Sequence, residues 1–281
     1  MTLELICTGL AFPESPRWHD GAFWLSDFYT RCVHRLDLAT GTLDTVAQVP
    51  GQPSGLGWLP DGRMLVVSML DKRVLRQEPD GALVTHADLG ALASFHCNDM
   101  WVDTEGRAYV GHFGFDLLGK AALRPASIIL VTPEGAARTV ATDMMFPNGT
   151  ALTLDGGTLI VAETAANRLT AFDVAADGSL SRRRVWADLG AAAPDGICLD
   201  AQGAVWLASP RTRECLRVRK GGEVLERIAT EDPAIACMLG GEDGRTLLLL
   251  TGHVAAAEPS LARRSGRAWT VRVEVPTVRA G

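Results

Sequence analysis

The stretch FPNGTALTLDGGTLIVAET, residues 146–164, contains a pattern that returns at residues 194–209 as PDGICLDAQGAVWLAS. Each copy has a proline, then an Asn-Gly or Asp-Gly pair, then a turn ending in glycine and a run of apolar residues. Asn148 and Asp195 each stand eight residues before the second glycine of their copy. Proline and Asn-Gly or Asp-Gly pairs favour turns, and runs of β-branched or aromatic residues favour strands. The pattern therefore predicts paired strands in both places.

The same turn occurs six times along the chain. Its aligned glycines lie 41 to 50 residues apart and are Gly21, Gly62, Gly106, Gly156, Gly203 and Gly244. A β-rich run follows each glycine, and in several copies a third segment follows and ends in another turn. Four antiparallel strands repeated at this period are typical of a propeller blade. We predict an all-β fold, a six-bladed β-propeller with four-stranded antiparallel blades, as a single domain over residues 1–281.

The ends of the chain predict how the ring of blades closes. The sixth copy has candidate strands near residues 236–240, 245–251 and 267–274, but little chain remains for a fourth. The segment TLELICTG, residues 2–9, precedes the first copy and resembles a fourth strand. We therefore expect the N-terminal strand to complete the last blade and hide two sheet edges. The third copy carries an insertion at residues 114–126, which either shapes a mouth or is a tolerated surface insertion.

Composition and charge exclude several classes of partner. The chain has 281 residues, 47% hydrophobic and 21% charged, with a net charge of −6. Because it is acidic and has no Lys/Arg stripe, it has no field that could hold a phosphate backbone, and we expect no nucleic-acid partner. No stretch reaches the roughly 18 apolar residues of a membrane span, and the first residues do not resemble a signal peptide. We expect a cytoplasmic protein without a membrane partner, and the sequence leaves its oligomeric state open.

The cysteines and histidines show no spacing typical of a disulfide framework or a zinc site. The six cysteines are scattered without a CxxC pair, so we expect reduced, packed thiols. Cys97 is expected to point away from the neighbouring Asn98, because successive side chains of a strand alternate between its faces. The six histidines form no HExxH motif. His112 is a candidate for the mouth of the channel, with a structural role favoured.

The aligned repeats bring together polar residues that are distant in sequence. The position eight residues before each aligned glycine is occupied, from the second copy onward, by Ser54, Asn98, Asn148, Asp195 and Ala236. In the first copy Glu14 lies seven residues before the glycine. Because these positions precede the innermost strands, the pseudo-sixfold symmetry predicts one ring of side chains at a channel mouth. Taken singly, Asn148 and Asp195 also fit ordinary turn chemistry.

A ring with four oxygen-bearing side chains, from Glu14, Asn98, Asn148 and Asp195, needs partners for its buried polar atoms. The two carboxylates would repel each other without a cation. Carboxylate and amide oxygens suit hard cations. We therefore predict one divalent cation, with calcium preferred and manganese, zinc, magnesium or ferrous iron as alternatives. Such an ion could polarise a carbonyl or phosphoryl oxygen.

These segments resemble the senescence-marker-protein/gluconolactonase/luciferin-regenerating-enzyme family, whose relatives include diisopropyl fluorophosphatases and bacterial lactonases. The matching segments follow one another along nearly the whole chain and are FPESPRW, CNDMWVDTEGRAYVGHFG, FPNGTALTLDGGTLIVAET, PDGICLDAQGAVWLA and CMLGGEDGRTLLLLT. The resemblance implies a divalent cation bound by Glu14, Asn148 and Asp195. It also implies that Asn98 lies beside the metal or contacts substrate, and that Asp195 transfers a proton when water attacks a lactone carbonyl.

The chain departs from this family pattern at several positions. Ser15 stands where the family commonly has glycine, and Met100 replaces the glycine of a frequent Asn-Asp-Gly sequence. Sugar-lactone-hydrolysing members have an arginine where this chain has His96, and a glutamate of the following loop corresponds to Asp116. We expect His96, Asn98 and Asp116 to orient the substrate. The contacts to sugar hydroxyls are thus altered at two points.

The leading hypothesis is a metal-dependent lactonase, which opens a small-molecule sugar lactone or related cyclic ester. In this hypothesis the cation polarises the carbonyl and Asp195 assists an attacking water. One alternative is a phosphotriesterase-like hydrolase, because the same electrophilic metal can serve either centre. Another is a non-catalytic propeller that binds a small molecule or a protein and has a structural metal, because propellers host both kinds of function. A third is a condensing enzyme that resembles strictosidine synthase and lacks this metal set.

Overall fold

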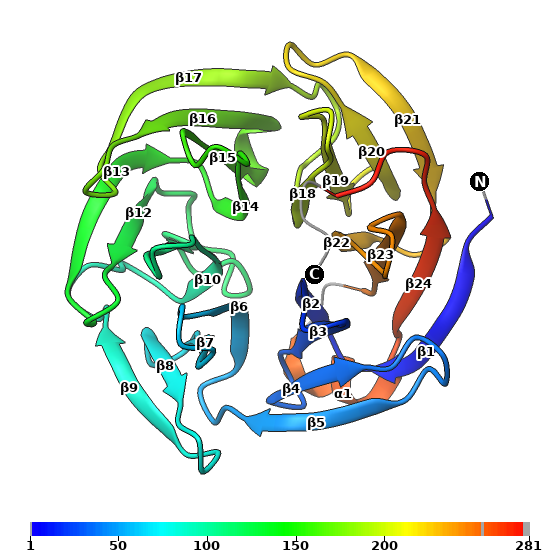
Figure 1. The fold of residues 1–281 in the computed structure, drawn as a ribbon, viewed down its shortest axis with the longest axis horizontal. Coiled ribbons are helices and arrows are strands. Elements are labelled where there is room, and N and C mark those ends of the chain that lie inside the picture. The colour runs from blue at the N-terminus through cyan, green and yellow to red at the C-terminus, as the bar shows by residue number, and fades with distance from the viewer. Residues whose placement is uncertain (1, 254–255, 278–281) are drawn as a thin grey trace.

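Six four-stranded antiparallel sheets surround a central axis in the computed structural model, which describes residues 2–253 and 256–277 (Figure 1). In the first five sheets the strands follow sequence order from the axis outward. This arrangement confirms the six-bladed β-propeller that the repeat predicts.

Each of the first three blades consists of four consecutive strands. Blade 1 comprises β2 (Pro13–His19), β3 (Ala22–Asp27), β4 (Cys32–Leu36) and β5 (Leu43–Gln48). Blade 2 comprises β6 (Pro53–Trp58), β7 (Met64–Ser68), β8 (Arg73–Gln77) and β9 (Leu83–Asp88). Blade 3 comprises β10 (Cys97–Val102), β11 (Ala108–His112), β12 (Ala126–Val131) and β13 (Ala137–Met144). The predicted insertion is the connection between β11 and β12.

The remaining blades differ in their inner strand or their closure. Blade 4 comprises β14 (Pro147–Leu152), β15 (Thr158–Glu163), β16 (Arg168–Val174) and β17 (Leu180–Asp188), with a short 3-10 helix, η1 (Thr164–Ala166). Blade 5 comprises β18 (Ile197–Leu199), β19 (Val205–Ser209), β20 (Glu214–Val218) and β21 (Val224–Ala229). Blade 6 comprises β22 (Ala234–Gly240), β23 (Thr246–Thr251), β24 (Gly266–Arg272) and β1 (Glu4–Leu10). The helix α1 (Ala257–Arg263), between β23 and β24, was not predicted.

The N-terminal strand closes the ring, as predicted. β1 pairs antiparallel with β24, with Glu4 opposite Thr270 and Leu5 opposite Trp269. The outermost strand of blade 6 therefore comes from the opposite end of the chain (Figure 1). This pairing joins the two ends of the chain. It also covers the edge of β24 that a three-stranded blade would expose.

The apolar core fills the spaces between neighbouring blades. Tyr109 and Ile128 of blade 3 pack with Leu159 and Phe172 of blade 4 in one buried cluster. The outermost strands are more exposed, as β17 shows with its exposed and half-buried residues 180–185. The six cysteines are free and buried, as the sequence predicts.

The aligned glycines explain why the repeat is visible in the sequence. All six have φ between 69° and 86°. Residues with a Cβ atom adopt this left-handed conformation only at a cost, whereas glycine adopts it freely. Each copy therefore needs glycine at the same point of its turn.

Two of these glycines provide a matched test of turn strain and packing. Gly62→Ala introduces a Cβ at φ +86° with nothing within 4 Å, whereas Gly106→Ala, at φ +81°, places it 2.8 Å from Cδ of Pro60. We expect Gly62→Ala to lower the free energy of unfolding by about 1 kcal/mol, and Gly106→Ala by at least about 1 kcal/mol more. Urea denaturation of both variants measures the difference. Equal losses would show that the contact with Pro60 relaxes freely.

Candidate functional site

The predicted ring residues lie together at one end of the channel. Glu14, Asn98 and Asn148 are the second residues of β2, β10 and β14. They lie within the inner strands, whereas the repeat analysis expected them to precede the strands. Asp195 does precede its strand, and its backbone N–H donates to the Ala208 carbonyl at 2.9 Å, which holds it beside β19. All four side chains are buried, with at most 7% of each residue exposed.

Hydrogen bonds connect the ring residues across the blades. The Asn98 Nδ2 group donates to Asn148 Oδ1 at 3.1 Å. In turn, Asn148 Nδ2 donates to Thr164 Oγ1 at 3.3 Å, and Thr164 Oγ1 donates to the Pro194 carbonyl at 2.7 Å. This chain of contacts leads from blade 3 through blade 4 to the residue before Asp195. The ends of the asparagine side chains are therefore fixed before any ligand binds.

The glycines after the ring positions have a packing role. Gly149 and Gly196 do not have positive φ values, so the Asn-Gly and Asp-Gly pairs are not there for a left-handed turn. A Cβ on Gly149 would lie 2.5 Å from the carbonyl oxygen of Asp195, and one on Gly196 would lie 2.4 Å from Cβ of Ala236. The absence of a side chain lets neighbouring inner strands approach closely. Asn148 and Gly149 lie within β14 and form no turn, whereas Gly196 lies at a bend just before β18. Both glycines help to bring the ring residues together.

The carboxyl groups of the ring are destabilised in their charged forms. Burial raises the pKa of Glu14 well above its usual value, and the negative charges of Asp195 and Asp99 raise it further. Burial also raises the pKa of Asp195, followed by the charge of Asp99, while a hydrogen bond from Asn148 lowers it. Asp195 Oδ1 is buried and has no hydrogen-bond partner. Buried carboxylate oxygens need a donor or a cation, so this arrangement fits a cation site.

A buried ion pair beside the ring was missed in the sequence. Arg17 Nη2 lies 2.6 Å from Asp99 Oδ1, and both side chains are buried. Arg17 also donates from Nε to the Leu56 carbonyl at 3.1 Å and from Nη1 to the Pro16 carbonyl at 2.8 Å. A β-bulge between Cys97 and Met100 disturbs the alternation that would otherwise set the direction of Asp99. The only sequence signals were the acidic residue directly after Asn98 and the arginine in ESPRW.

The ion pair completes the charge balance of the site. Glu14, Asp99 and Asp195 contribute three carboxylates, and Arg17 contributes one guanidinium. Two negative charges remain when all four groups are ionised, and a divalent cation would balance them. The described residues contain no group of three or more His, Cys, Asp or Glu side chains arranged to hold a metal ion. A cation at this ring would therefore have to depend on asparagine oxygens as well as carboxylates.

The two other predicted substrate contacts lie at the same end of blade 3. His96 directly precedes β10, and its ring stacks on Phe95 with centroids 4.0 Å apart. Burial lowers the pKa of His96, while the nearby charge of Asp116 raises it. Asp116 lies in the loop between β11 and β12, where its Oδ1 accepts a hydrogen bond from the Gly119 N–H at 2.7 Å. Both side chains are thus partly committed to contacts within their own loops.

His112 and Cys97 have the structural surroundings that the sequence analysis favoured. The Ser127 N–H donates to His112 Nε2 at 3.0 Å, which assigns the ring proton of the neutral histidine to Nδ1. Burial and the charge of Lys72 lower the pKa of His112 to about 4. Burial raises the pKa of Cys97 to about 12, so its thiol stays protonated and is a poor nucleophile.

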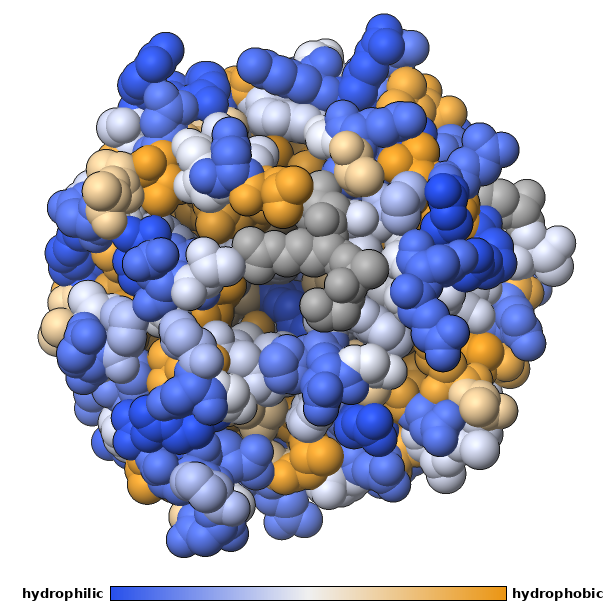
Figure 2. Space-filling model, in the orientation of Figure 1, coloured by the Kyte–Doolittle hydropathy of each residue, from blue (hydrophilic) through white to orange (hydrophobic). Residues whose placement is uncertain are grey.

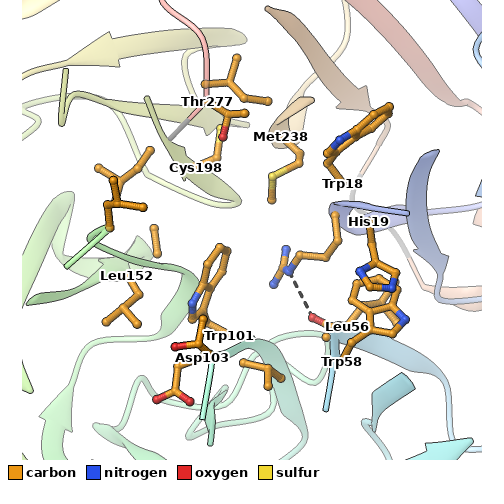
Figure 3. Close-up of a pocket in the computed structure, with 18 of the residues that line it drawn as sticks. Trp18, His19, Leu56, Trp58, Trp101, Asp103, Leu152, Cys198, Met238 and Thr277 are labelled. Atoms are coloured by element: carbon orange, nitrogen blue, oxygen red, sulfur yellow. Dashed lines mark hydrogen bonds between the residues drawn. The ribbon is translucent and has the colours of Figure 1, made fainter. Parts of the chain in front are cut away.

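A cavity of about 400 Å³ lies at the opposite end of the channel from the ring. Its walls include the far ends of the inner strands, with Trp18, Trp58 and Trp101 among the lining residues (Figure 3). His19 stacks on Trp58 with centroids 3.8 Å apart. Figure 2 shows the face on which this cavity opens, with a hollow near its centre. Because the cavity holds none of the four ring residues, we place the candidate reactive site at the ring and not in this cavity.

The Arg17–Asp99 pair can be tested by removing one partner or both. Arg17→Met leaves Asp99 buried without its cation, and we expect the free energy of unfolding to fall by about 3–5 kcal/mol in metal-free protein. In the double variant Arg17→Met/Asp99→Asn the side chain at position 99 no longer carries a charge that has lost its partner, so most of the loss should be recovered. Chemical denaturation of both variants without metal measures this. A double variant no more stable than the single would show that the pair is not electrostatic in origin.

Comparisons with known proteins place the chain in a family. Residues 12–253 match the family model described as SMP-30/Gluconolactonase/LRE-like region. A 6-deoxy-6-sulfogluconolactonase from Pseudomonas putida is 26% identical over 94% of this chain and 91% of its own length. No helix among the described residues is long and apolar enough to cross a membrane.

Solved structures share the fold. A calcium-binding protein, regucalcin, from Agrobacterium tumefaciens superposes with a TM-score of 0.80 at 22% identity, covering 95% of this chain and 92% of its own. A gluconolactonase from Xanthomonas campestris has a TM-score of 0.77 at 23% identity, with 98% and 89% covered. These likenesses concern the fold, and the match to the family model covers most of the sequence. The chain belongs to the SMP-30/gluconolactonase/LRE-like family.

Proposed function

We propose that this protein is a metal-dependent hydrolase that opens a lactone, either a sugar lactone or a related cyclic ester. The observation that carries the proposal is the buried cluster of Glu14, Asn98, Asn148 and Asp195, in which Asp195 Oδ1 has no hydrogen-bond partner. Family membership and the sulfogluconolactonase relative support lactone hydrolysis as the reaction.

The residues that would hold the cation are Glu14, Asn148 and Asp195, with Asn98 beside them. Their donors are carboxylate and amide oxygens, the ligands of hard cations, and we propose calcium as the preferred ion. The regucalcin neighbour, described as calcium-binding, supports this choice. When bound, such an ion would polarise the lactone carbonyl and stabilise the developing oxyanion.

The side chains in and around the ring have separate roles in the proposed reaction. Asp195 would accept the proton of the attacking water, because it is a ring carboxylate whose Oδ1 has no hydrogen-bond partner among the described residues. Asn98 would orient the substrate through its amide, which the contact with Asn148 Oδ1 already fixes. His96 and Asp116 would contact the part of the substrate that lies outside the ring. Arg17 would hold the Asp99 carboxylate in place through their ion pair.

The metal and the reaction can be tested together with two variants. Asp195→Asn preserves the shape of the side chain but removes its charge. We expect this variant to lose its bound calcium and to hydrolyse lactones at least about a hundredfold more slowly, because a general base contributes about that factor to the rate. Asp103→Asn is the matched control, because Asp103 is also buried but lines the opposite cavity and pairs with Arg107. Elemental analysis and a pH-indicator assay on a lactone panel provide the measurements.

Several outcomes would redirect the proposal. Hydrolysis that survives removal of metal by a chelator would refute the metal dependence. Turnover of phosphotriesters but of no lactone would favour the phosphotriesterase alternative. A wild-type protein that binds metal, gains thermal stability from it and turns over neither class would identify a binding propeller with a structural ion.

A further inference from the structure

We propose that the entrance to the ring binds an apolar substituent of the substrate, so that the preferred lactones carry an alkyl or aryl side chain and not a set of hydroxyl groups. This inference rests on the proposed function, because it names the substrate class of the same site. It is drawn from the residues that surround the ring end of the channel.

Phenylalanine is concentrated at the ring end of the strands. The chain has eight phenylalanines. Six of them adjoin the ring-side ends of inner strands or of their neighbours, and these are Phe12, Phe28, Phe95, Phe113, Phe115 and Phe146. Backbone hydrogen bonds fix this placement, since the Phe28 N–H donates to the Phe12 carbonyl at 3.1 Å and the Phe113 N–H to the His96 carbonyl at 3.0 Å. Distribution through the core alone would not gather them at one end.

On blades 3 and 4 these side chains form a continuous aromatic wall, defined here as Phe95, His96, Phe113, Phe115 and Phe146. Successive ring centroids lie 4.0 Å apart for Phe95–His96, 6.4 Å for His96–Phe113, 4.9 Å for Phe113–Phe146 and 5.7 Å for Phe115–Phe146. The wall is anchored next to the ring, because Phe146 is two residues from Asn148 and His96 is two residues from Asn98. A substrate whose carbonyl reaches the four polar ring residues therefore has its substituents near these aromatic side chains.

The wall is partly exposed, and the loop that carries Phe115 has further exposed apolar side chains beside its charged Asp116, Lys120 and Arg124. Phe95, Phe113 and Phe115 are half-buried. The loop between β11 and β12 adds three exposed leucines, Leu117, Leu118 and Leu123, of which Leu118 is 53% exposed. A hydrogen bond from Ser94 Oγ to the Gly114 carbonyl at 3.3 Å connects this loop to the segment before β10. Clustered apolar side chains left exposed beside a binding site commonly mark the surface that a ligand covers.

The two polar side chains predicted to contact substrate at this entrance each contact a neighbouring residue. One face of His96 is covered by Phe95, and Oδ1 of Asp116 accepts a hydrogen bond from Gly119, so contacts to hydroxyl groups are limited to the His96 ring nitrogens and Asp116 Oδ2. Selection for a hydroxylated ligand requires polar side chains whose donors and acceptors would otherwise be unpaired. An aromatic wall instead increases the affinity for a ligand with each methylene group that it removes from water.

The test uses a series of γ-lactones that have the same five-membered lactone and progressively longer alkyl side chains. D-glucono-δ-lactone is the hydroxylated reference. For the wild type we expect kcat/KM to rise by about three- to fourfold per buried methylene until the wall is covered. Most of this rise should come from a lower KM with kcat little changed, because the side chain contacts the wall equally in the ground and transition states. The corresponding γ-lactams, used as inhibitors, should show the same chain-length dependence in their inhibition constants.

Variants of the wall separate a binding role from packing. Phe113→Ala should flatten the chain-length dependence, and Phe113→Leu should restore most of it, since leucine keeps much of the apolar surface. Phe172→Leu is the matched control: Phe172 is a buried phenylalanine of β16 that packs between blades 3 and 4, away from the wall. It should lower stability without changing the dependence on chain length.

The outcomes distinguish this inference from the proposed function. A flat chain-length dependence in wild type, a clear preference for D-glucono-δ-lactone, or an unchanged dependence in Phe113→Ala would overturn the apolar entrance while lactone hydrolysis stands. Conversely, lactams that bind more tightly with longer chains to a protein that opens no lactone would support the apolar entrance and refute the proposed reaction.

Discussion

The pairing of β1 with β24 is the constraint on which the remaining structure depends. β1 leads directly into blade 1 and pairs with β24 of blade 6, so this antiparallel pair completes blade 6 and closes the ring. Closure fixes six inner strands around one axis. Side chains from blades 1, 3, 4 and 5 can then meet at one end of a channel, although they are separated by up to 181 positions between Glu14 and Asp195.

Bringing these side chains together has an electrostatic cost. Three carboxyl groups lie buried near one another, and burial raises the pKa of Glu14 and Asp195. Arg17 offsets part of the cost by pairing with Asp99 and by donating to backbone carbonyls of neighbouring strands. A divalent cation would neutralise the charge that remains. The same burial that destabilises the ionised carboxyl groups would thus favour binding of a cation in the proposed site.

The two ends of the channel have different chemistry because the two ends of the inner strands have different residues. The ring end combines buried carboxylates and amides with an aromatic wall. The other end is a cavity with tryptophan among its lining residues, and Arg17 borders it from the side of the ring. The propeller determines only that two such ends exist. The residues at each end determine which of them is suited to reaction, and the polar groups there favour the ring.

The period of the turns was sufficient to predict the six blades, their four strands and the closing N-terminal strand, because each copy needs glycine with positive φ at the same point. The same alignment also predicted Glu14, Asn98, Asn148 and Asp195 as one ring, since repeated positions become neighbours by symmetry. The sequence could not predict the pairing of Arg17 with Asp99, because a β-bulge sets the direction of Asp99. Nor could it predict the helix α1, the close strand approach at Gly149 or the opposite cavity. These features depend on how side chains from separate blades pack, and only the tertiary structure determines which of them meet.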